Sequence, residues 1–132
     1  MEIIYKIGLV PDVEEIIAVY KSSGINRPVE DKKRIKQMYA QSNLVLTAWH
    51  KGILVGIARS LTDCCYCCYL SDLAVKVEYQ KQGIGKKLVH LCKQAVGNQT
   101  TLILISAAEA IDYYPKIGLI RTDHAFIIRR TE

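Results

Sequence analysis

The sequence predicts a mixed α/β (α+β) fold, with a central, mostly antiparallel twisted sheet and helices on both of its faces. Two observations support this class. Strand-like segments of alternating or continuous apolar residues are interspersed with segments whose apolar residues recur at helical spacing. The first half of the chain favours hairpins between neighbouring strands, whereas the second half places a helix between two strands, as a crossover requires.

The first half of the chain carries clear start and stop signals. Pro11 precedes a helix start rich in negative charge, and Gly24 is placed to end that helix. Pro28 opens a second helix, and Lys51–Gly52 forms a tight turn of the kind that joins antiparallel strands. The expected elements are a strand over residues 2–7, helices over about 12–23 and 28–41, and hairpin strands over 43–50 and 53–61.

The second half alternates strands with helices. Thr62 and Asp63 are expected to turn the chain into a long strand, and a short polar loop joins that strand to an amphipathic helix. The expected elements are a strand over 64–75, a helix over about 83–96, a strand over 101–106, a short helix to about Tyr114, and a final strand pair around Leu119 and 125–130. A strand, a glycine loop and a helix in this order form the arrangement that an anion site needs.

The run QKQGIG, from Gln80 to Gly85, lies between that long strand and the amphipathic helix. Gly83 and Gly85 let the backbone approach an anion without a Cβ in the way, and the helix directs its unpaired N–H groups and positive dipole end to the same spot. Lys86 and Lys87 follow, and no third glycine stands in register, so the common nucleotide-binding motifs do not fit. The run therefore predicts a pyrophosphate cradle of another kind.

QKQGIG resembles the Arg/Gln-x-x-Gly-x-Gly/Ala signature of the GCN5-related N-acetyltransferases, the GNAT superfamily, which holds the pyrophosphate of acetyl-coenzyme A (acetyl-CoA). A second segment, Ala110–Leu119, resembles the family's Ala-x-x-aromatic-Tyr-x-x-x-Gly-Phe pattern. The two segments occur in the family's order, which makes the resemblance more specific than either alone. It implies a GNAT-like fold and the transfer of an acetyl group from acetyl-CoA to a primary amine of a small molecule or protein.

The resemblance also implies where the cofactor would be held. The glycine loop would bind the pyrophosphate through backbone N–H groups. The end of the preceding strand would pair with the pantetheine arm like an added strand, and the N–H of Val75 or its neighbour would meet the developing oxyanion. The implied cofactor-binding residues are Leu73, Ala74, Val75, Gln80, Lys81, Gln82, Gly83, Ile84, Gly85 and Lys86.

Tyr114 matches the family's usual general acid, which would protonate the departing thiolate. A phenol, with a pKa of about 10, lies above a thiol, with a pKa of about 8.5, so it can serve in this role. Tyr113 is its rival. Adjacent helical residues point about 100° apart, so one tyrosine is expected to face the sulfur and the other to pack in the core.

A general base is harder to assign. In the family a glutamate or histidine often stands at the positions of Tyr69 and Ser71, and neither residue here is a good base. Asp72 has the opposite strand parity, so it should point away from both unless a bulge intervenes. Glu109, a chain of water molecules or an acceptor with a low amine pKa, such as an α-amino group, would meet the need.

Acceptor specificity is expected from the first two helices and the segment that joins them. The candidate residues there are Tyr20, Ser22, Asn26, Arg27 and Glu30. They do not identify the acceptor, although Arg27 would suit a carboxylate. Because the base is uncertain, a non-catalytic acyl-CoA-binding module is the alternative to an enzyme.

The formal net charge of +5 is dispersed along the chain. Basic residues are not interleaved with aromatic ones in the manner of surfaces that stack bases, so a nucleic-acid partner is not expected. Lysines around the glycine loop suit a polyanionic cofactor instead. A membrane partner is not expected either, whereas a homodimer is, because the C-terminal strand would be exposed.

The five cysteines do not form a disulfide framework. On a strand, Cys64 and Cys68 would face one way while Cys65 and Cys67 faced the other, so we expect them to pack as small apolar side chains and expect no metal site. We expect a single domain over residues 1–132. We also expect a cytoplasmic location, because the first ten residues are charged and alternate like a strand rather than like a signal peptide.

Overall fold

The computed structural model describes all of residues 1–132. Its five strands follow the order β1-β2-β3-β4-β5, and every neighbouring pair is antiparallel except β4–β5, which is parallel. The elements are β1 (Ile4–Ile7), α1 (Val13–Ser23), α2 (Lys32–Ala40), β2 (Leu44–His50), β3 (Ile53–Thr62), β4 (Cys67–Val75), α3 (Ile84–Val96), β5 (Thr101–Ile103) and α4 (Tyr113–Lys116), with short 3-10 turns at Val77–Tyr79 and Ala108–Ala110.

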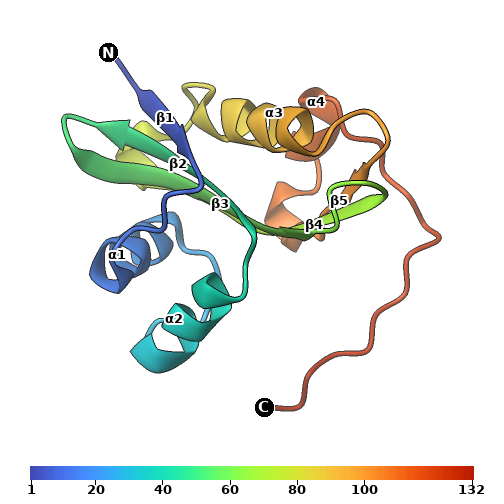
Figure 1. Ribbon diagram of the computed structural model, residues 1–132, viewed down its shortest axis with the longest axis horizontal. Coiled ribbons are helices and arrows are strands. Elements are labelled where there is room, and N and C mark those ends of the chain that lie inside the picture. Colours follow the sequence, from blue (N-terminus) through green and yellow to red (C-terminus); the bar gives the residue numbers. More distant parts are fainter.

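The predicted fold class is confirmed. Helices α1 and α2 cover one face of the sheet, and α3 and α4 lie on the other (Figure 1). No helix has the length and apolar character needed to cross a membrane.

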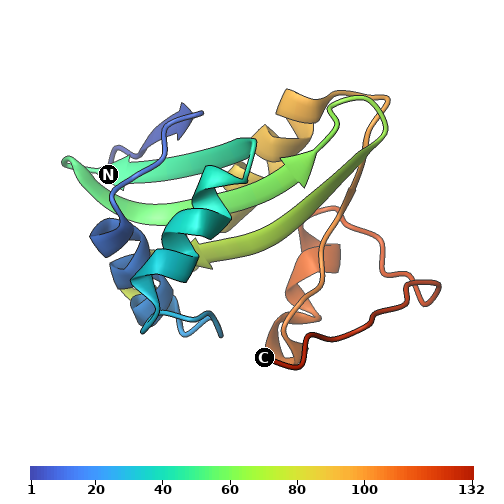
Figure 2. The same cartoon turned by 60° about the horizontal axis from the view of Figure 1, so that its bottom comes forward.

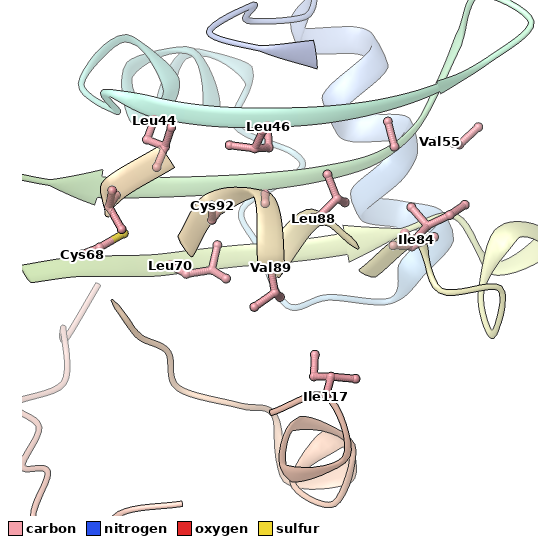
Figure 3. Close-up of a cluster of buried hydrophobic side chains, with 14 residues drawn as sticks. Leu44, Leu46, Val55, Cys68, Leu70, Ile84, Leu88, Val89, Cys92 and Ile117 are labelled. Carbon is pink, nitrogen blue, oxygen red and sulfur yellow. The ribbon is translucent and has the colours of Figure 1, made fainter. Parts of the chain in front are cut away.

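Two apolar cores lie on the two faces of the sheet. The core beneath α3 contains Leu88 and Cys92 of that helix, Leu46 of β2 and Leu70 of β4 (Figure 3). The other core lies beneath α1 and α2 and includes Ile35, which is fully buried. Because both faces are covered, β2 and β3 are buried along nearly their whole lengths.

Local signals fixed most element ends as expected. Lys51 and Gly52 both adopt positive φ angles, 51° and 78°, which is the conformation of a two-residue hairpin turn. Gly24 ends α1 at φ 80°. Helix α2 begins later than Pro28, at Lys32, because the Asp31 side chain accepts a hydrogen bond from the Arg34 N–H and caps the helix there.

The hairpin between β3 and β4 corrects the expected strand over 64–75, which begins only at Cys67. One carboxylate oxygen of Asp63 accepts hydrogen bonds from the N–H groups of Cys65, Tyr66 and Cys67, and this holds the segment in a turn. Cys64, Cys65 and Cys67 are therefore exposed, and only Cys68 packs in the core. The expectation that they pack as small apolar side chains is therefore wrong for Cys64, Cys65 and Cys67.

The C-terminal part of the sheet is also smaller than expected. β5 ends at Ile103 rather than at residue 106, and residues 119–132 contain no strand. The predicted strand pair around Leu119 and 125–130 is therefore wrong for the single chain. A strand needs a neighbour to bond with its backbone, and β-propensity alone cannot supply one.

A β-bulge at Ser71 sets the direction of the end of β4. Arg59 pairs with Asp72 and Ser60 pairs with Leu70, so Ser71 has no partner on β3. Before the bulge, Leu70 packs in the core beneath α3; after it, Asp72 and Ala74 face α1 and α2. Strict alternation would have placed Asp72 beside Leu70, under α3.

Asp72 is the centre of a buried polar network that joins two helices, the segment between them and two strands. Its carboxylate accepts hydrogen bonds from the Nε atoms of Arg27 and Arg59, each at 2.7 Å, and from the Tyr20 hydroxyl. Tyr20 also shares a hydrogen bond with the hydroxyl of Tyr39 at 2.6 Å. The network connects α1, the α1–α2 segment, α2, β3 and β4, and no buried side-chain nitrogen or oxygen lacks a partner.

Asp72 is ionised although it is fully buried. Burial raises its pKa, but the hydrogen bond and charge of Arg59, with the charge of Arg27, outweigh burial and hold the pKa below its ordinary value. Burial, together with the neighbouring Tyr39 and Asp72, raises the pKa of Tyr20. Tyr20 therefore stays a neutral donor to the carboxylate.

We predict that Asp72→Asn lowers the free energy of unfolding by about 3–5 kcal/mol at pH 7, because it leaves the buried guanidinium of Arg59 and the half-buried guanidinium of Arg27 without their counter-ion. The Asp72 pKa is depressed in the folded state, so this stabilisation is complete above the unfolded pKa of about 3.9 and is lost as the pH falls through the folded value. Urea unfolding should give a constant wild-type-to-variant difference from about pH 5 to 8 that shrinks below pH 4.

The matched control is Asp112→Ala, because Asp112 is exposed and its side chain caps nothing. It should leave the free energy of unfolding unchanged. An equal loss in both variants, or a wild-type-to-Asn difference that does not shrink at all between pH 4 and pH 2, would contradict the assigned role of Asp72.

Candidate functional site

A cleft of about 1130 Å³ opens where β4 and β5 part. The two strands pair only over Cys67–Tyr69 and Thr101–Ile103, although β4 continues to Val75. The α1–α2 segment lines one side of the cleft, and the residues after β5, with Tyr114 of α4 and the C-terminal tail, line the other. Figure 2 shows the ribbon of the α1–α2 segment and, across from it, the chain that follows β5 and the C-terminal end. A smaller hollow beside Trp49 lies at the β1 side of the sheet and includes none of the glycine-loop residues.

The outer half of β4 presents unpaired backbone to this cleft. The Lys76 N–H donates to the Val55 carbonyl on β3, at 2.8 Å. Because backbone groups alternate in direction along a strand, those of Leu73 and Val75 point away from β3, toward the open side. The Gln80 side-chain amide donates to the Val75 carbonyl at 2.9 Å, which leaves the Val75 N–H directed at the cleft.

The glycine loop continues from Gln80 into the first turn of α3. Lys81 and Gly83 adopt positive φ angles of 63° and 85°, which turn the chain into the helix. The first hydrogen bond to close the helix runs from the Lys87 N–H to the Gly83 carbonyl, and the N–H groups of residues 82–86 have no acceptor within the chain. A Cβ built on Gly83 would meet nothing within 4 Å, so the space beside these amides is open.

The charge near these amides is positive. Lys81, Lys86 and Lys87 are exposed around the loop, and no acidic residue lies in the first turn of α3. The N-terminal end of a helix that carries free N–H groups and nearby ammonium groups attracts anions. The arrangement can therefore bind a polyanion such as a pyrophosphate.

Gly85, in the first turn of α3, lies close to a neighbouring tyrosine. A Cβ at position 85 would lie 2.9 Å from the hydroxyl oxygen of Tyr113. The two tyrosine rings of α4 meet edge to face, with centroids 5.1 Å apart. Tyr113 is thus the more exposed ring, placed against the start of α3, while Tyr114 is half-buried at the core and lines the cleft.

The family model described as "Acetyltransferase (GNAT) domain" matches residues 16–128, which is most of the chain. The chain belongs to the GNAT acetyltransferase family. The predicted resemblance to this family is therefore confirmed.

Curated relatives include GCN5-related N-acetyltransferase 2 of Arabidopsis thaliana, 33% identical over 70 residues, which are 49% of this chain and 26% of that protein. The uncharacterized N-acetyltransferase ycf52 of Porphyra purpurea is 27% identical over 103 residues, which are 74% of this chain and 58% of that protein. The match thus spans between about a quarter and three fifths of these relatives' lengths.

Solved structures agree on the GNAT fold. A Staphylococcus aureus protein of unknown function, described as a probable acetyltransferase, has a TM-score of 0.80 at 20% identity, over 96% of this chain and 100% of that one. An aminoglycoside N-acetyltransferase in complex with CoA has a TM-score of 0.74 at 13% identity, over 98% and 95% of the two chains. At these identities the likeness is one of fold.

The structure brings together many of the residues that the family resemblance marked. Leu73, Ala74, Val75, Gln80 and Tyr114 line the cleft. Lys81, Gln82, Gly83, Ile84, Gly85 and Lys86 form the adjoining loop and the first turn of α3. The Ile84 side chain is buried in the core beneath α3, so that residue can offer a ligand only its backbone.

The two tyrosines do not divide as the sequence predicted. We expected one to face the cleft and the other to pack in the core. Instead, Tyr114 lines the cleft and also packs partly against the core, whereas Tyr113 is exposed. Burial, and to a smaller extent the charge of Tyr113, raises the pKa of Tyr114. The phenol at position 114 therefore stays protonated at neutral pH, as a proton donor must.

The structure removes Asp72 from the candidates for a general base. Its carboxylate is ionised, but four donors already engage it, including the Ser71 hydroxyl at 3.0 Å. Asp72 does not point away from Ser71, because a bulge intervenes at Ser71, which is the exception stated with the parity argument. Glu109 lines the cleft and is exposed, so it remains a candidate.

Only some of the residues that were predicted to determine acceptor specificity line the cleft. Asn26, Arg27 and Glu30 line the cleft, whereas Tyr20 is buried and Ser22 accepts a hydrogen bond from the Val77 N–H. Arg27 donates to Asp72 and to two backbone carbonyls, so its guanidinium is already occupied. The sequence analysis did not predict that Arg59 pairs with Asp72, because neither its position on β3 nor its neighbours in the sequence indicate an ion pair.

We predict that Gly85→Ala costs at most about 1 kcal/mol, because the new methyl group meets the hydroxyl at the far end of the exposed Tyr113 side chain, which can move aside. Tyr113→Phe removes the atom that clashes. A double-mutant cycle by urea unfolding should therefore show a smaller cost for Gly85→Ala in the Tyr113→Phe background. Equal costs in the two backgrounds would mean that another contact limits position 85.

Proposed function

We propose that this protein is an acetyl-CoA-dependent N-acetyltransferase that acetylates a primary amine of a small molecule or protein. One observation carries the proposal: the free N–H groups of residues 82–86, at the positive end of α3, adjoin a cleft whose wall is the unpaired backbone of β4. The amides suit the pyrophosphate of the cofactor, and the open strand edge suits the amide-bearing pantetheine arm.

The volume of the cleft is consistent with this use. Ligand sites of ordinary size enclose about 300–1,000 Å³, and a cleft of about 1130 Å³ can accept a long cofactor arm with an acceptor beside it. The Val75 N–H would stabilise the oxyanion of the thioester carbonyl, and Tyr114 would protonate the departing thiolate. Both roles use groups that line the cleft.

The acceptor amine must lose a proton before it attacks. With Asp72 held in its ion network, Glu109 or water must take that proton, or the acceptor must have a low pKa. An α-amino group, with a pKa of about 7.7–8.0, needs far less help than a lysine side chain at about 10.4. The five free thiols suit a reducing compartment, so we propose that the protein acts in the cytoplasm.

A non-catalytic acyl-CoA-binding module is the second candidate, and the engagement of Asp72 favours it. It shares the cofactor site and lacks turnover. The two functions therefore separate on activity rather than on binding.

Calorimetry with acetyl-CoA, CoA and ATP tests the cofactor. We predict micromolar binding of both CoA forms, little binding of ATP, and loss of binding in Gly83→Glu, whose side chain places a carboxylate beside the loop amides. Gly83→Ala is the matched control, because it shares the strained positive φ but adds no charge. Wild-type protein that binds neither CoA form would remove both candidate functions.

Tyr114→Phe tests the chemistry. We predict that kcat for acetyl transfer falls by about 100-fold or more, the range for loss of a general acid, while the acetyl-CoA Kd stays unchanged. Tyr66→Phe, in the exposed β3–β4 turn, is the matched control and should behave as wild type. If Tyr113→Phe rather than Tyr114→Phe abolishes turnover, the proton donor is Tyr113.

A further inference from the structure

The turn between β3 and β4 exposes a group of thiols that lies outside the cleft. Cys64, Cys65 and Cys67 are exposed, whereas the next residue, Cys68, is buried in the core beneath α3. Cysteine is among the residues most often found buried, because a free thiol usually packs as a small apolar side chain. Packing therefore accounts for Cys68 and leaves the three exposed thiols unexplained.

The backbone holds Cys64 and Cys67 on the two sides of one tight loop. The Asp63 N–H donates to the Cys67 carbonyl at 3.3 Å, and only Cys64, Cys65 and Tyr66 lie between this closing pair. One carboxylate oxygen of Asp63 fixes the loop by accepting three of its N–H groups. Residues i and i+3 of so tight a loop lie near the Cα separation of about 4.4–6.8 Å that a disulfide requires. The Cys-x-x-Cys pair is therefore already folded for closure.

Cys64 has an unusual backbone conformation. Its φ is 61°, in the left-handed region that glycine, asparagine and aspartate adopt more readily than other residues. A turn that served only to reverse the chain would favour one of those residues at this position. A cysteine here indicates that the side chain, rather than the backbone, has a use.

The three exposed thiols differ in their surroundings. The charge of Asp63 raises the pKa of the Cys65 thiol, and Cys67 and Cys64 add smaller contributions in the same direction. The Cys67 thiol donates a hydrogen bond to the second carboxylate oxygen of Asp63, with the sulfur 3.8 Å away. No hydrogen bond joins the Cys64 thiol to Asp63, and its N–H donates to the Thr62 hydroxyl. Because the thiolate is the reactive form, Cys64 is placed to react first.

We propose that Cys64 and Cys67 form a reversible disulfide on reaction with hydrogen peroxide, which makes the β3–β4 turn a site of oxidative modification. The exposed pair is accessible to a small oxidant, and the fixed loop holds the second thiol beside the first. The buried Cys68 and Cys92 are shielded from the same oxidant. This inference does not depend on the proposed function.

The reaction has two steps. The Cys64 thiolate attacks one peroxide oxygen, so an S–O bond forms, the O–O bond breaks, and the departing hydroxide takes a proton to become water. The Cys67 thiolate then attacks the sulfur of the sulfenic acid, so the S–S bond forms, the S–O bond breaks, and the second hydroxide leaves as water with the proton lost by Cys67. Two thiols lose two electrons, and one hydrogen peroxide becomes two waters. Two molecules of a thiol such as glutathione reverse the change by exchange and become a disulfide themselves.

Differential alkylation of the full chain tests the pairing. Reduced protein is treated with an equimolar amount of hydrogen peroxide, its remaining thiols are blocked with N-ethylmaleimide, and the thiols released by a reductant are labelled with iodoacetamide. A single tryptic peptide, residues 60–76, carries the whole cysteine run, so fragmentation assigns each label. Cys64 and Cys67 should carry the second label, and Cys65 and Cys68 the first. A second label on Cys65 or Cys68, disulfides between chains, or thiols that peroxide leaves unchanged would overturn the proposal.

Serine variants separate the two steps. Cys64→Ser should abolish the disulfide, whereas Cys67→Ser should stop the reaction at a Cys64 sulfenic acid that dimedone captures. Cys65→Ser, in the same exposed turn, is the matched control and should form the disulfide as the wild type does. All three residues are exposed, so circular dichroism should show an intact fold in each variant. Loss of the disulfide in Cys65→Ser, or its persistence in Cys64→Ser, would contradict the assigned pair.

Discussion

The buried carboxylate of Asp72 is the constraint on which the rest of the structure depends. Removing a carboxylate and two guanidinium groups from water is costly, and the cost is offset only when every donor and acceptor is matched. Here the matching groups come from residues as far apart as Tyr20, Arg27, Arg59 and Asp72. Helix α1, the α1–α2 segment and α2 are therefore held against β3 and β4 in one arrangement, and one wall of the cleft is formed before any ligand arrives.

A second wall of the cleft, the outer half of β4, is built on a different principle. β4 is covered by β5 over three residue pairs and then stands alone, so its backbone supplies N–H and C=O groups in a regular row. Beyond the end of β4, the free N–H groups at the start of α3 extend this row of backbone groups. A surface made of backbone groups binds ligands by shape and by hydrogen bonds, and it depends little on which side chains line it. The two walls thus combine a rigid ionic frame with an open backbone edge.

Local chemistry decided what the sequence could reveal. Lys51–Gly52, Gly24 and the run from Gln80 to Gly85 each act through their own backbone conformation, and each was recognisable before the fold was known. The bulge at Ser71 has no such signal, because it depends on how β3 and β4 align over their whole lengths. Asp63 carries a local signal for the turn that follows it, since an aspartate at a turn commonly accepts hydrogen bonds from the next N–H groups. The predicted strand pair near the C-terminus is absent for another reason. β-propensity shows that a segment can form a strand, but a neighbouring strand must be present for it to do so.

The bulge at Ser71 positions both the ionic network of Asp72 and the open backbone edge of β4. One inserted residue turns Asp72 from the core beneath α3 to the side of α1 and α2, where it meets Arg27 and Arg59. The same turn directs Leu73 and Val75 toward α3 and places their backbone groups at the start of the open edge. A carboxylate that stabilises two guanidinium groups cannot also accept a proton from a substrate, because protonation would leave both cations unpaired. The family's fold in this chain therefore uses its acidic residue on β4 for architecture, and the proton transfers of the proposed reaction would rely on other groups that line the cleft, among them Glu109 and Tyr114.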